Sequence, residues 1–346
     1  LTEPLNGRGK CQNRNRCSRG CPYGAYFSSN AVTLPAADAT GNLTIRPYSI
    51  VQSIIYDEQK GKATGVRIID SETNEDIEYS AKIIFVNAST LGTTQILLNS
   101  TSNRFENGLG NDSGTLGKYV AFHNYRSRVS GKYDGYLDKT TDGRSPTSGY
   151  IPRFRNVEKQ ETDFLRGYMV FYGADRSVGN YDGIGAELKN AASEPGPWNI
   201  SMMMQGETIP KESNHVRLSK DKLDPWGIPQ LITSIDYDDN DVKSMKDFLN
   251  TASEMLDKVG CKDIRQNDSK QAPGLDIHEM GGVRMGHDPK TSLLDKWNAM
   301  HECKNVFVTD GASMTSTSTQ NPSLTFMALT ARAANYAVEQ LKKGEL

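Results

Sequence analysis

One continuous apolar run does most to constrain what this chain can fold into. After Lys82, the residues Ile-Ile-Phe-Val are all apolar, which is typical of a strand buried on both faces of a sheet. Small residues at 87–90 then lead into a short helix expected at 91–98, where Leu91, Gln95 and Leu98 share one face. A strand, turn and helix in this order often contact a nucleotide at the edge of an α/β sheet, although plain packing of the sheet explains the pattern equally well.

Other segments predict antiparallel strands and one long helix. β-Branched or alternating residues predict strands at 43–46, 49–56, 63–69 and 76–80. In the middle third we expect a separate substrate-binding sheet, with strands at 165–172, 198–205, 215–218 and 230–235. An apolar stripe predicts a helix over 239–259, capped by Asp239 or Asn240 and ended by Gly260. For the methionines at 202–204 two interpretations stay open, of which filling gaps in the core is the more common one and lining a pocket the alternative.

Charge and hydropathy argue against two classes of partner. The 346 residues carry a formal net charge of −2, which gives no electrostatic reason to expect nucleic acid or an anionic membrane as a partner. No apolar run approaches the ~20 residues that a membrane span requires. The polar start at Leu1, without a methionine, suggests a piece of a longer chain, so the compartment stays open between bacterial periplasm and cytoplasm.

Three of the five cysteines, Cys11, Cys17 and Cys21, lie close together near the start of the chain. The glycines and the proline around them predict a loop in which three thiols can converge, and neighbouring arginines favour the thiolate form. Three interpretations remain open. A zinc site would need a fourth ligand and usually has closer spacing. The cysteines can be structural and bind no metal, or their thiolates can hold an iron–sulfur cluster.

The C-terminal part of the sequence brings several reactive groups to the end of one predicted strand. His278 opens the run His-Glu-Met-Gly-Gly-Val-Arg-Met-Gly, and a strand expected at 305–308 runs into Asp310 and Gly311. Asn321 then precedes Pro322, which opens a long helix. A base, an amide and a helix N-terminus in this layout indicate a redox site built around a cofactor. Taken alone, Asn321 is also an ordinary helix N-cap, and His123 is expected to be structural.

These segments resemble the glucose-methanol-choline (GMC) family of flavin oxidoreductases. Residues 84–98 are similar to its second signature, and residues 305–311 with 321–329 are similar to its C-terminal block. The run that begins at His278 resembles the form found in pyranose oxidases and related sugar dehydrogenases. The cysteine loop, followed by Pro22, is similar to the loop that holds a 3Fe–4S cluster in flavin-dependent bacterial glucose dehydrogenases and glucoside 3-dehydrogenases.

The resemblance implies an FAD-dependent enzyme that oxidises a hydroxyl group of a sugar or glycoside. His278 would accept the hydroxyl proton, a task that suits a neutral imidazole, and Asn321 would hold the hydroxyl in line. The helix at Pro322 would direct its positive end toward the reduced flavin. A cluster on Cys11, Cys17 and Cys21 would pass electrons to a cytochrome, with a small subunit as a further partner. The expected cofactor-binding residues are Val51, Ala88, Asp310, Gly311, Asn321 and Pro322.

The implied fold class is α/β with mixed α+β segments, combining part of a GMC-type FAD/NAD(P)-binding fold with an antiparallel substrate domain. We expect the cysteine loop and the remainder of the FAD-binding domain at 1–124, the substrate domain at 125–275 and the catalytic return at 276–346. The sequence differs from the family pattern in two ways. No Gly-x-Gly-x-x-Gly follows a predicted strand in these residues, and Thr315 and Thr319 stand where a proline and a glycine are usual. Two alternatives therefore remain: an oxidase that uses O2 without a cluster, or a non-catalytic carbohydrate-binding subunit.

Overall fold

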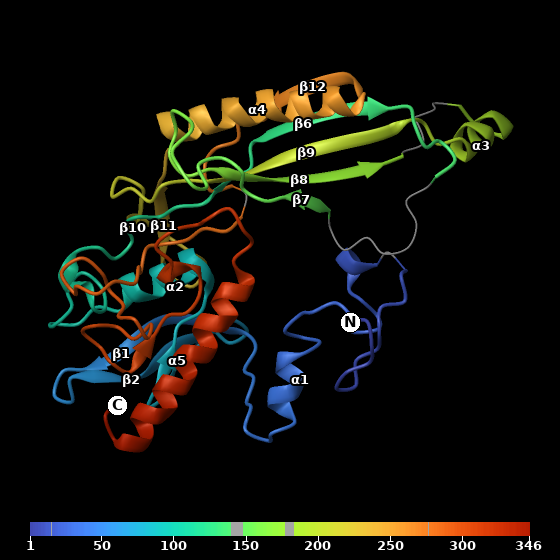
Figure 1. The fold of residues 1–346 in the computed structure, drawn as a ribbon. Helices are drawn as coiled ribbons and strands as arrows, with labels where there is room; N and C mark the ends of the chain where they lie inside the picture. Colours follow the sequence, from blue (N-terminus) through green and yellow to red (C-terminus); the bar gives the residue numbers. More distant parts are fainter. Residues whose placement is uncertain (15, 140–147, 177–182, 276) are drawn as a thin grey trace.

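The computed structural model describes every residue of the chain except 15, 140–147, 177–182 and 276. Its elements form two layered regions, one around a large antiparallel sheet and one around several short strands and two helices (Figure 1). The N-terminal segment, with helix α1 (Thr33–Asp38) and the 3-10 helix η1 (Cys17–Arg19), lies below the far end of the large sheet. The mixed α/β class predicted from the sequence is confirmed.

Three strands of the first region form an antiparallel sheet close to the predicted bounds. These are β1 (Ser49–Asp57), β2 (Lys62–Asp70) and β3 (Asp76–Ser80). The strand predicted at 43–46 is wrong, because this segment pairs with no described strand and Ile45 is 62% exposed. Pro47 has no N–H to donate and Tyr48 has a φ of +56°, so the backbone turns just before β1.

A short parallel strand pair lies at the centre of this region. Strand β4 (Ile84–Phe85) pairs with β13 (Val306–Phe307), and the rings of Phe85 and Phe307 stack with centroids 4.9 Å apart. Both strands are shorter than predicted. Helix α2 (Ser89–Asn99) follows β4, whereas the 3-10 helix η3 (Gly311–Ser313) follows β13, so two helices begin at the same edge of the pair. Helix α5 (Ser323–Lys343) ends the chain.

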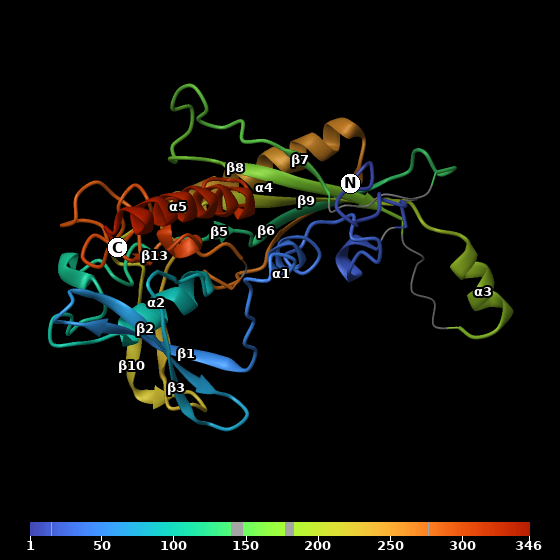
Figure 2. The same cartoon turned by 90° about the horizontal axis from the view of Figure 1, so that it is seen from below.

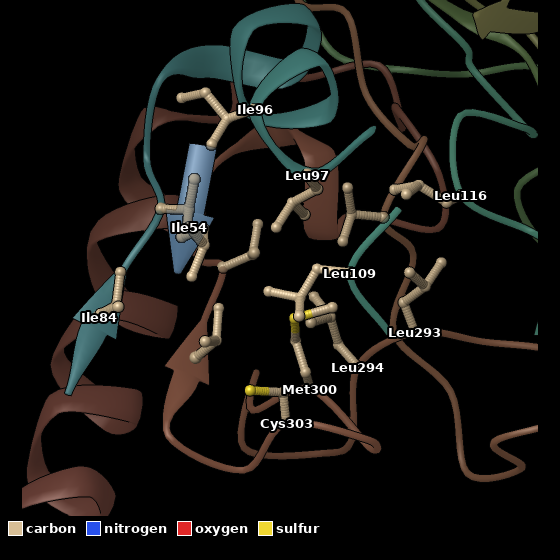
Figure 3. Packing of buried hydrophobic residues seen from close by; sticks show 14 of the residues in the cluster. Ile54, Ile84, Ile96, Leu97, Leu109, Leu116, Leu293, Leu294, Met300 and Cys303 are labelled. Carbon is tan, nitrogen blue, oxygen red and sulfur yellow. The ribbon is translucent and has the colours of Figure 1, made fainter. Parts of the chain in front are cut away.

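The hydrophobic core of this region joins segments from both ends of the sequence (Figure 3). Leu97 of α2 and Leu294 are both fully buried in it. Burying one such side chain contributes roughly 1.5–3 kcal/mol, so this cluster holds the C-terminal segment against α2. Other members of the cluster are Ile54, Ile84, Ile96, Leu109, Leu116, Leu293, Met300 and Cys303.

The second region is a six-stranded antiparallel sheet covered by a helix, as Figures 1 and 2 show. Helix α4 (Asp239–Val259) has the predicted bounds and packs Phe248 and Leu256 against the sheet, but Asp238 caps it instead of the predicted Asp239 or Asn240. The strands are β5 (His123–Asn124), β6 (Ser127–Tyr133), β7 (Gly149–Ile151), β8 (Tyr168–Asp175), β9 (Trp198–Glu207) and β12 (Lys262–Asp268).

The remaining elements are peripheral. Strands β10 (His215–Leu223) and β11 (Pro229–Ser234) form the predicted antiparallel pair, but they lie apart from the large sheet. The 3-10 helix η2 (Asn111–Ser113) and helix α3 (Ala186–Ser193) complete the described elements. Among the described residues, no helix combines the length and apolarity needed to cross a membrane. The predicted boundaries at 124/125 and 275/276 stay a prediction, and residue 276 lies outside the described part.

Candidate active site

The segment that carries His278 is held between two other backbone segments. Met280 and Ala121 exchange two N–H···O hydrogen bonds of 2.8 Å, and the N–H of Gly281 donates to the carbonyl of Gly311 at 3.0 Å. Gly281 has a φ of +89°, and a Cβ atom there would lie 2.2 Å from the carbonyl oxygen of Tyr119. Only glycine fits this position, because both the left-handed backbone and the close approach exclude a side chain. The Gly-Gly pair of the motif therefore fixes the place of His278.

His278 is half-buried and its imidazole faces a second histidine. Its Nδ1 atom lies 2.8 Å from Nδ1 of His123, with the two rings nearly perpendicular. Burial lowers the pKa of His278 below its usual value. His123 is almost fully buried, and this burial, followed by repulsion from His278, lowers its pKa to about 4. A structural role is predicted for His123 from the sequence, and its ring is in direct contact with that of the predicted base.

The loop between η3 and α5 is held through its backbone. Nε2 of His123 lies 3.2 Å from the carbonyl oxygen of Thr317 and 3.0 Å from that of Ser318. The side-chain amide of Gln205, in β9, donates to the carbonyl of Thr319 at 2.9 Å. Ser318 has a left-handed φ of +54°, a conformation that costs free energy unless the surroundings fix it. The large sheet thus fixes the loop that leads to Asn321.

Asn321 is exposed and its side chain makes no hydrogen bond with the described residues. The alternative of an ordinary helix cap is wrong, because Pro322 occupies the N-cap of α5 and no side chain caps that helix. Pro322 suits this position, since its missing N–H is one that a helix leaves unpaired. The amide of Asn321 is therefore available to a ligand.

Asn321 lines a pocket of about 610 Å³, a size typical of small-molecule sites. Its wall comes from the large sheet and from the N-terminal segment. His278 does not itself line it, although its neighbour Ile277 does, and the ring centroid of the lining residue Tyr125 lies 6.4 Å from that of His278. The side chains that line the pocket include Tyr26, Tyr125, Arg128, Phe171, Tyr172 and Asn321.

Hydrogen bonds join four residues at the carboxyl edge of β4 and β13. Thr93 donates from Oγ1 to Oδ2 of Asp310 at 2.6 Å, and accepts from the N–H of Ala88 at 2.9 Å. The N–H of Ala312 donates to Oδ1 of Asp310 at 3.0 Å. Burial raises the pKa of Asp310, and the donors from Thr93 and Ala312 oppose that rise. Ala88 and Asp310, both predicted from the sequence, are thus brought together.

The face of α2 that packs against this site differs from the prediction. Leu91, Gln95 and Leu98 are only partly buried, whereas Thr90 and Thr93 are buried. The hydroxyl of Thr90 donates to the carbonyl of Glu279 at 2.5 Å. The threonine side chains can be buried because their hydroxyls have hydrogen-bond partners on the C-terminal segment.

Gly311 and Val51 have different surroundings. A Cβ atom on Gly311 would lie 2.4 Å from Oγ1 of Thr90, so the close packing of α2 against η3 requires glycine. Val51 is 37% exposed at a bulge of β1, and no hydrogen bond among the described residues joins its side chain to the other predicted cofactor-binding residues. The role predicted for Val51 stays a prediction.

Cys11, Cys17 and Cys21 line one small cavity in the N-terminal loop, and all three are free thiols. Backbone N–H groups, those of Tyr26 and Tyr23 foremost, lower the pKa of Cys21. Within the described residues, however, no three Cys, His, Asp or Glu side chains have an arrangement that could hold a metal ion. The predicted cluster site is therefore present as three neighbouring thiols, without formed ligand geometry.

Sequence reasoning missed several residues of the pocket. Tyr26 and Arg128 carry no motif, and their place in the pocket depends on long-range folding. For the three methionines each interpretation holds in part: Met202 and Met204 are buried, whereas Met203, which alternates to the other face of β9, lines the pocket. Strand alternation could have separated Met203 from its neighbours.

Comparisons with known proteins identify the family of the chain. Two family models described as GMC oxidoreductase match residues 4–124 and 210–330. The chain is 29% identical to 2-methyl-1,2-propanediol dehydrogenase of Mycolicibacterium austroafricanum, over 97% of this chain and 61% of that protein. It is 25% identical to the fructose dehydrogenase large subunit of Gluconobacter japonicus, over 99% of this chain and 62% of the relative.

A solved structure supports the fold. Formate oxidase from Aspergillus oryzae RIB40 superposes with a TM-score of 0.61 at 14% identity, over 88% of this chain and 62% of the other. The chain thus spans about three fifths of the length of these proteins. Because the two GMC oxidoreductase models together match more than half of the chain, residues 4–124 and 210–330, the chain belongs to the GMC oxidoreductase family.

Proposed function

We propose that this chain is the catalytic part of an FAD-dependent dehydrogenase that oxidises a hydroxyl group of a sugar or glycoside to a carbonyl. The observation that carries the proposal is Asn321. Its amide has no hydrogen-bond partner among the described residues and lines a pocket of about 610 Å³ beside the segment of His278. Alcohol oxidation requires a base and a group that orients the hydroxyl, and His278, on the segment beside the pocket, and Asn321, in its lining, can supply them.

The pocket chemistry favours a polyhydroxylated substrate. The rings of Tyr26, Tyr125, Phe171 and Tyr172 offer apolar faces, while Arg128 and Asn321 offer hydrogen-bond donors. A sugar ring presents both kinds of surface, C–H faces and hydroxyl edges, and so matches this lining. Arg128 has no ion-pair partner within the described part of the chain, so its guanidinium is available to oxygen atoms of a ligand.

The residues at the carboxyl edge of β4 and β13 fit a bound FAD. Ala88, at the exposed N-terminus of α2, has no side chain that caps the helix, so the first N–H groups there can meet an anionic group of a cofactor. Asp310 and Gly311 lie beside it, and Asn321 and Pro322 open α5. When bound, FAD supplies the acceptor for the hydride that leaves the substrate carbon.

The chain's own residues would handle the proton and the orientation of the substrate. His278 accepts the hydroxyl proton at its free ring nitrogen, which is a general-base contribution of about 10²–10⁴-fold. Asn321 holds the substrate oxygen by a hydrogen bond and keeps the reacting C–H bond oriented.

The route by which electrons leave is a separate proposal. Cys11, Cys17 and Cys21 share one cavity, and backbone N–H groups lower the pKa of Cys21, which supports a 3Fe–4S cluster that serves a cytochrome partner. Their unformed ligand geometry favours a second candidate, an oxidase that passes electrons to O2. Iron and acid-labile sulfide in anaerobically prepared full-length protein would support the cluster; peroxide production without iron would support the oxidase.

The test of the main proposal uses the full-length protein. We expect a flavin absorption band that bleaches when a sugar is added under anaerobic conditions. A protein without flavin that still binds sugar in calorimetry would reject the enzyme and favour a carbohydrate-binding subunit.

A further inference from the structure

The pair of histidines at the site has a defined proton arrangement. Nε2 of His123 faces the carbonyl oxygens of Thr317 and Ser318 at 3.2 and 3.0 Å. A carbonyl oxygen can only accept a hydrogen bond, so Nε2 of His123 carries a proton and donates it. In the neutral ring, Nδ1 of His123 is then an acceptor.

His123 is neutral because its surroundings penalise charge. The residue is only 1% exposed, and burial lowers its pKa to about 4. The acidic residue nearest in the strand register is Glu207, which pairs with His123 across β5 and β9. Its carboxylate accepts a hydrogen bond from Ser316 and is not bonded to either imidazole. Tyr125, the ring beside both histidines, donates its hydroxyl to Gln205.

The acceptor on His123 determines which nitrogen of His278 carries the proton. Two ring nitrogens 2.8 Å apart need one proton between them, and Nδ1 of His123 has none to give. The proton therefore lies on Nδ1 of His278. Nε2 of His278 is left with its lone pair, and no hydrogen bond from the described residues reaches that atom.

We infer that His123 is a positioning residue that fixes the Nδ1–H tautomer of His278, so that Nε2 is the atom that accepts the substrate proton. A buried imidazole thereby takes the part that a carboxylate plays in other histidine-based sites, holding the base in one tautomer without adding a negative charge. The backbone carbonyls of Thr317 and Ser318 are the origin of the arrangement. The inference rests on the proposed role of His278 as base.

Two amide variants separate the two nitrogens of His123. In His123→Gln the amide NH2 can reach the carbonyls of Thr317 and Ser318, but nothing replaces the acceptor that faces His278. In His123→Asn the side-chain oxygen takes the place of Nδ1 and can still accept from His278. The two variants have the same functional group, and each keeps one of the two contacts of His123, so together they separate the role of Nδ1 from that of Nε2.

The experiment reads the histidine protons directly in full-length protein carrying 15N-labelled histidine, near pH 7.5. Two-bond proton–nitrogen spectra report which nitrogen is protonated, and the signals of His278 are identified by their loss in His278→Ala. We expect His278 protonated at Nδ1 in the wild type and in His123→Asn, and a mixture of tautomers in His123→Gln. We expect kcat to fall about 10²-fold in His123→Gln and less in His123→Asn, with KM nearly unchanged.

Two outcomes would overturn the inference: His278 protonated at Nε2 in the wild type, or an unchanged Nδ1–H tautomer in His123→Gln. The wild-type spectrum is decisive even if a variant fails to fold. Failure of the proposed function is distinguishable: sugar would then not bleach a flavin band, or His278→Ala would keep full turnover, while the wild-type spectrum still had the expected tautomers.

Discussion

Thr93 and Asp310 are joined by a hydrogen bond of 2.6 Å although 217 positions separate them in the sequence. The bond links the start of α2 to the start of η3, the two helices that begin at the carboxyl edge of the parallel strand pair. Through the same hydroxyl, Thr93 also accepts from the N–H of Ala88. One side chain thus connects two segments that are far apart in the sequence, at the strand edge where we expect the cofactor.

The first prediction concerns the removal of the Thr93 hydroxyl. Thr93→Val keeps the shape of the side chain, but leaves the buried carboxyl of Asp310 and the N–H of Ala88 without their partner. We expect a loss of roughly 1–3 kcal/mol in the free energy of unfolding, measured by urea denaturation. Thr93→Ser, which keeps the hydroxyl, should lose much less. Equal stability of Thr93→Val and wild type would show that the bond contributes nothing to folding.

The second prediction concerns the glycine after Met280. Gly281→Ala forces a Cβ atom to 2.2 Å from the carbonyl oxygen of Tyr119 at a φ of +89°. Gly61→Ala is the matched control, since Gly61 has a φ of +64° with open space around it. The control should lose about 1 kcal/mol from backbone strain alone, and Gly281→Ala several kcal/mol. Similar melting temperatures for the two variants would contradict the tight packing described here.

The third prediction tests the catalytic pair. His278→Ala should lower kcat by about 10²–10⁴-fold because the general base is lost, and Asn321→Ala should lower kcat because the substrate oxygen is no longer held. FAD content, read from the flavin absorbance per protein, should change far less. His287→Ala is the control, since His287 is exposed. Normal turnover in His278→Ala would require another base.

The fourth prediction is a pH effect on stability. The pKa of His123 is lowered to about 4 in the folded protein from an ordinary value of 6.5, so the unfolded chain binds its proton first. The stability due to the neutral buried ring is therefore present above pH 6.5 and is lost as the pH falls through 4. The difference corresponds to roughly 3 kcal/mol.

The measurement for this prediction is a comparison of two proteins. Asp241, whose pKa burial raises to about 7, opposes the effect, because its contribution is lost as the pH rises. Subtracting the unfolding free energies of His123→Gln from those of the wild type, at each pH from 4 to 8, removes the part due to Asp241. A flat difference curve would mean that His123 is not buried in its neutral form.

Local patterns in the sequence were enough for the elements that carry their own signal. The apolar stripe of α4 gave its bounds from 239 to 259, since burial against a sheet requires that periodicity. The strand predicted for the β-branched segment at 43–46 is absent, because a strand needs a pairing partner and the turn at Tyr48 separates this segment from β1. Propensity reports what a segment can form, whereas pairing decides what it does form.

The candidate site was predictable only in part. His278, Asp310, Gly311 and Asn321 belong to motifs with fixed spacing, but His123 has no such motif and its contact with His278 spans 155 positions. The buried face of α2 was misjudged for a related reason. Hydropathy counts threonine as polar, yet the hydroxyls of Thr90 and Thr93 are buried because distant groups satisfy them.

Side chains of His123 and Gln205 hold the loop before Asn321 by contacts to the carbonyl oxygens of residues 317–319. Every amino acid provides a carbonyl, so these contacts place little demand on which side chains the loop carries. Substitution can therefore accumulate in this loop while the amide of Asn321 stays in place. Threonine at 315 and 319, where a proline and a glycine are usual, therefore changes the sequence of the loop without changing the position of Asn321.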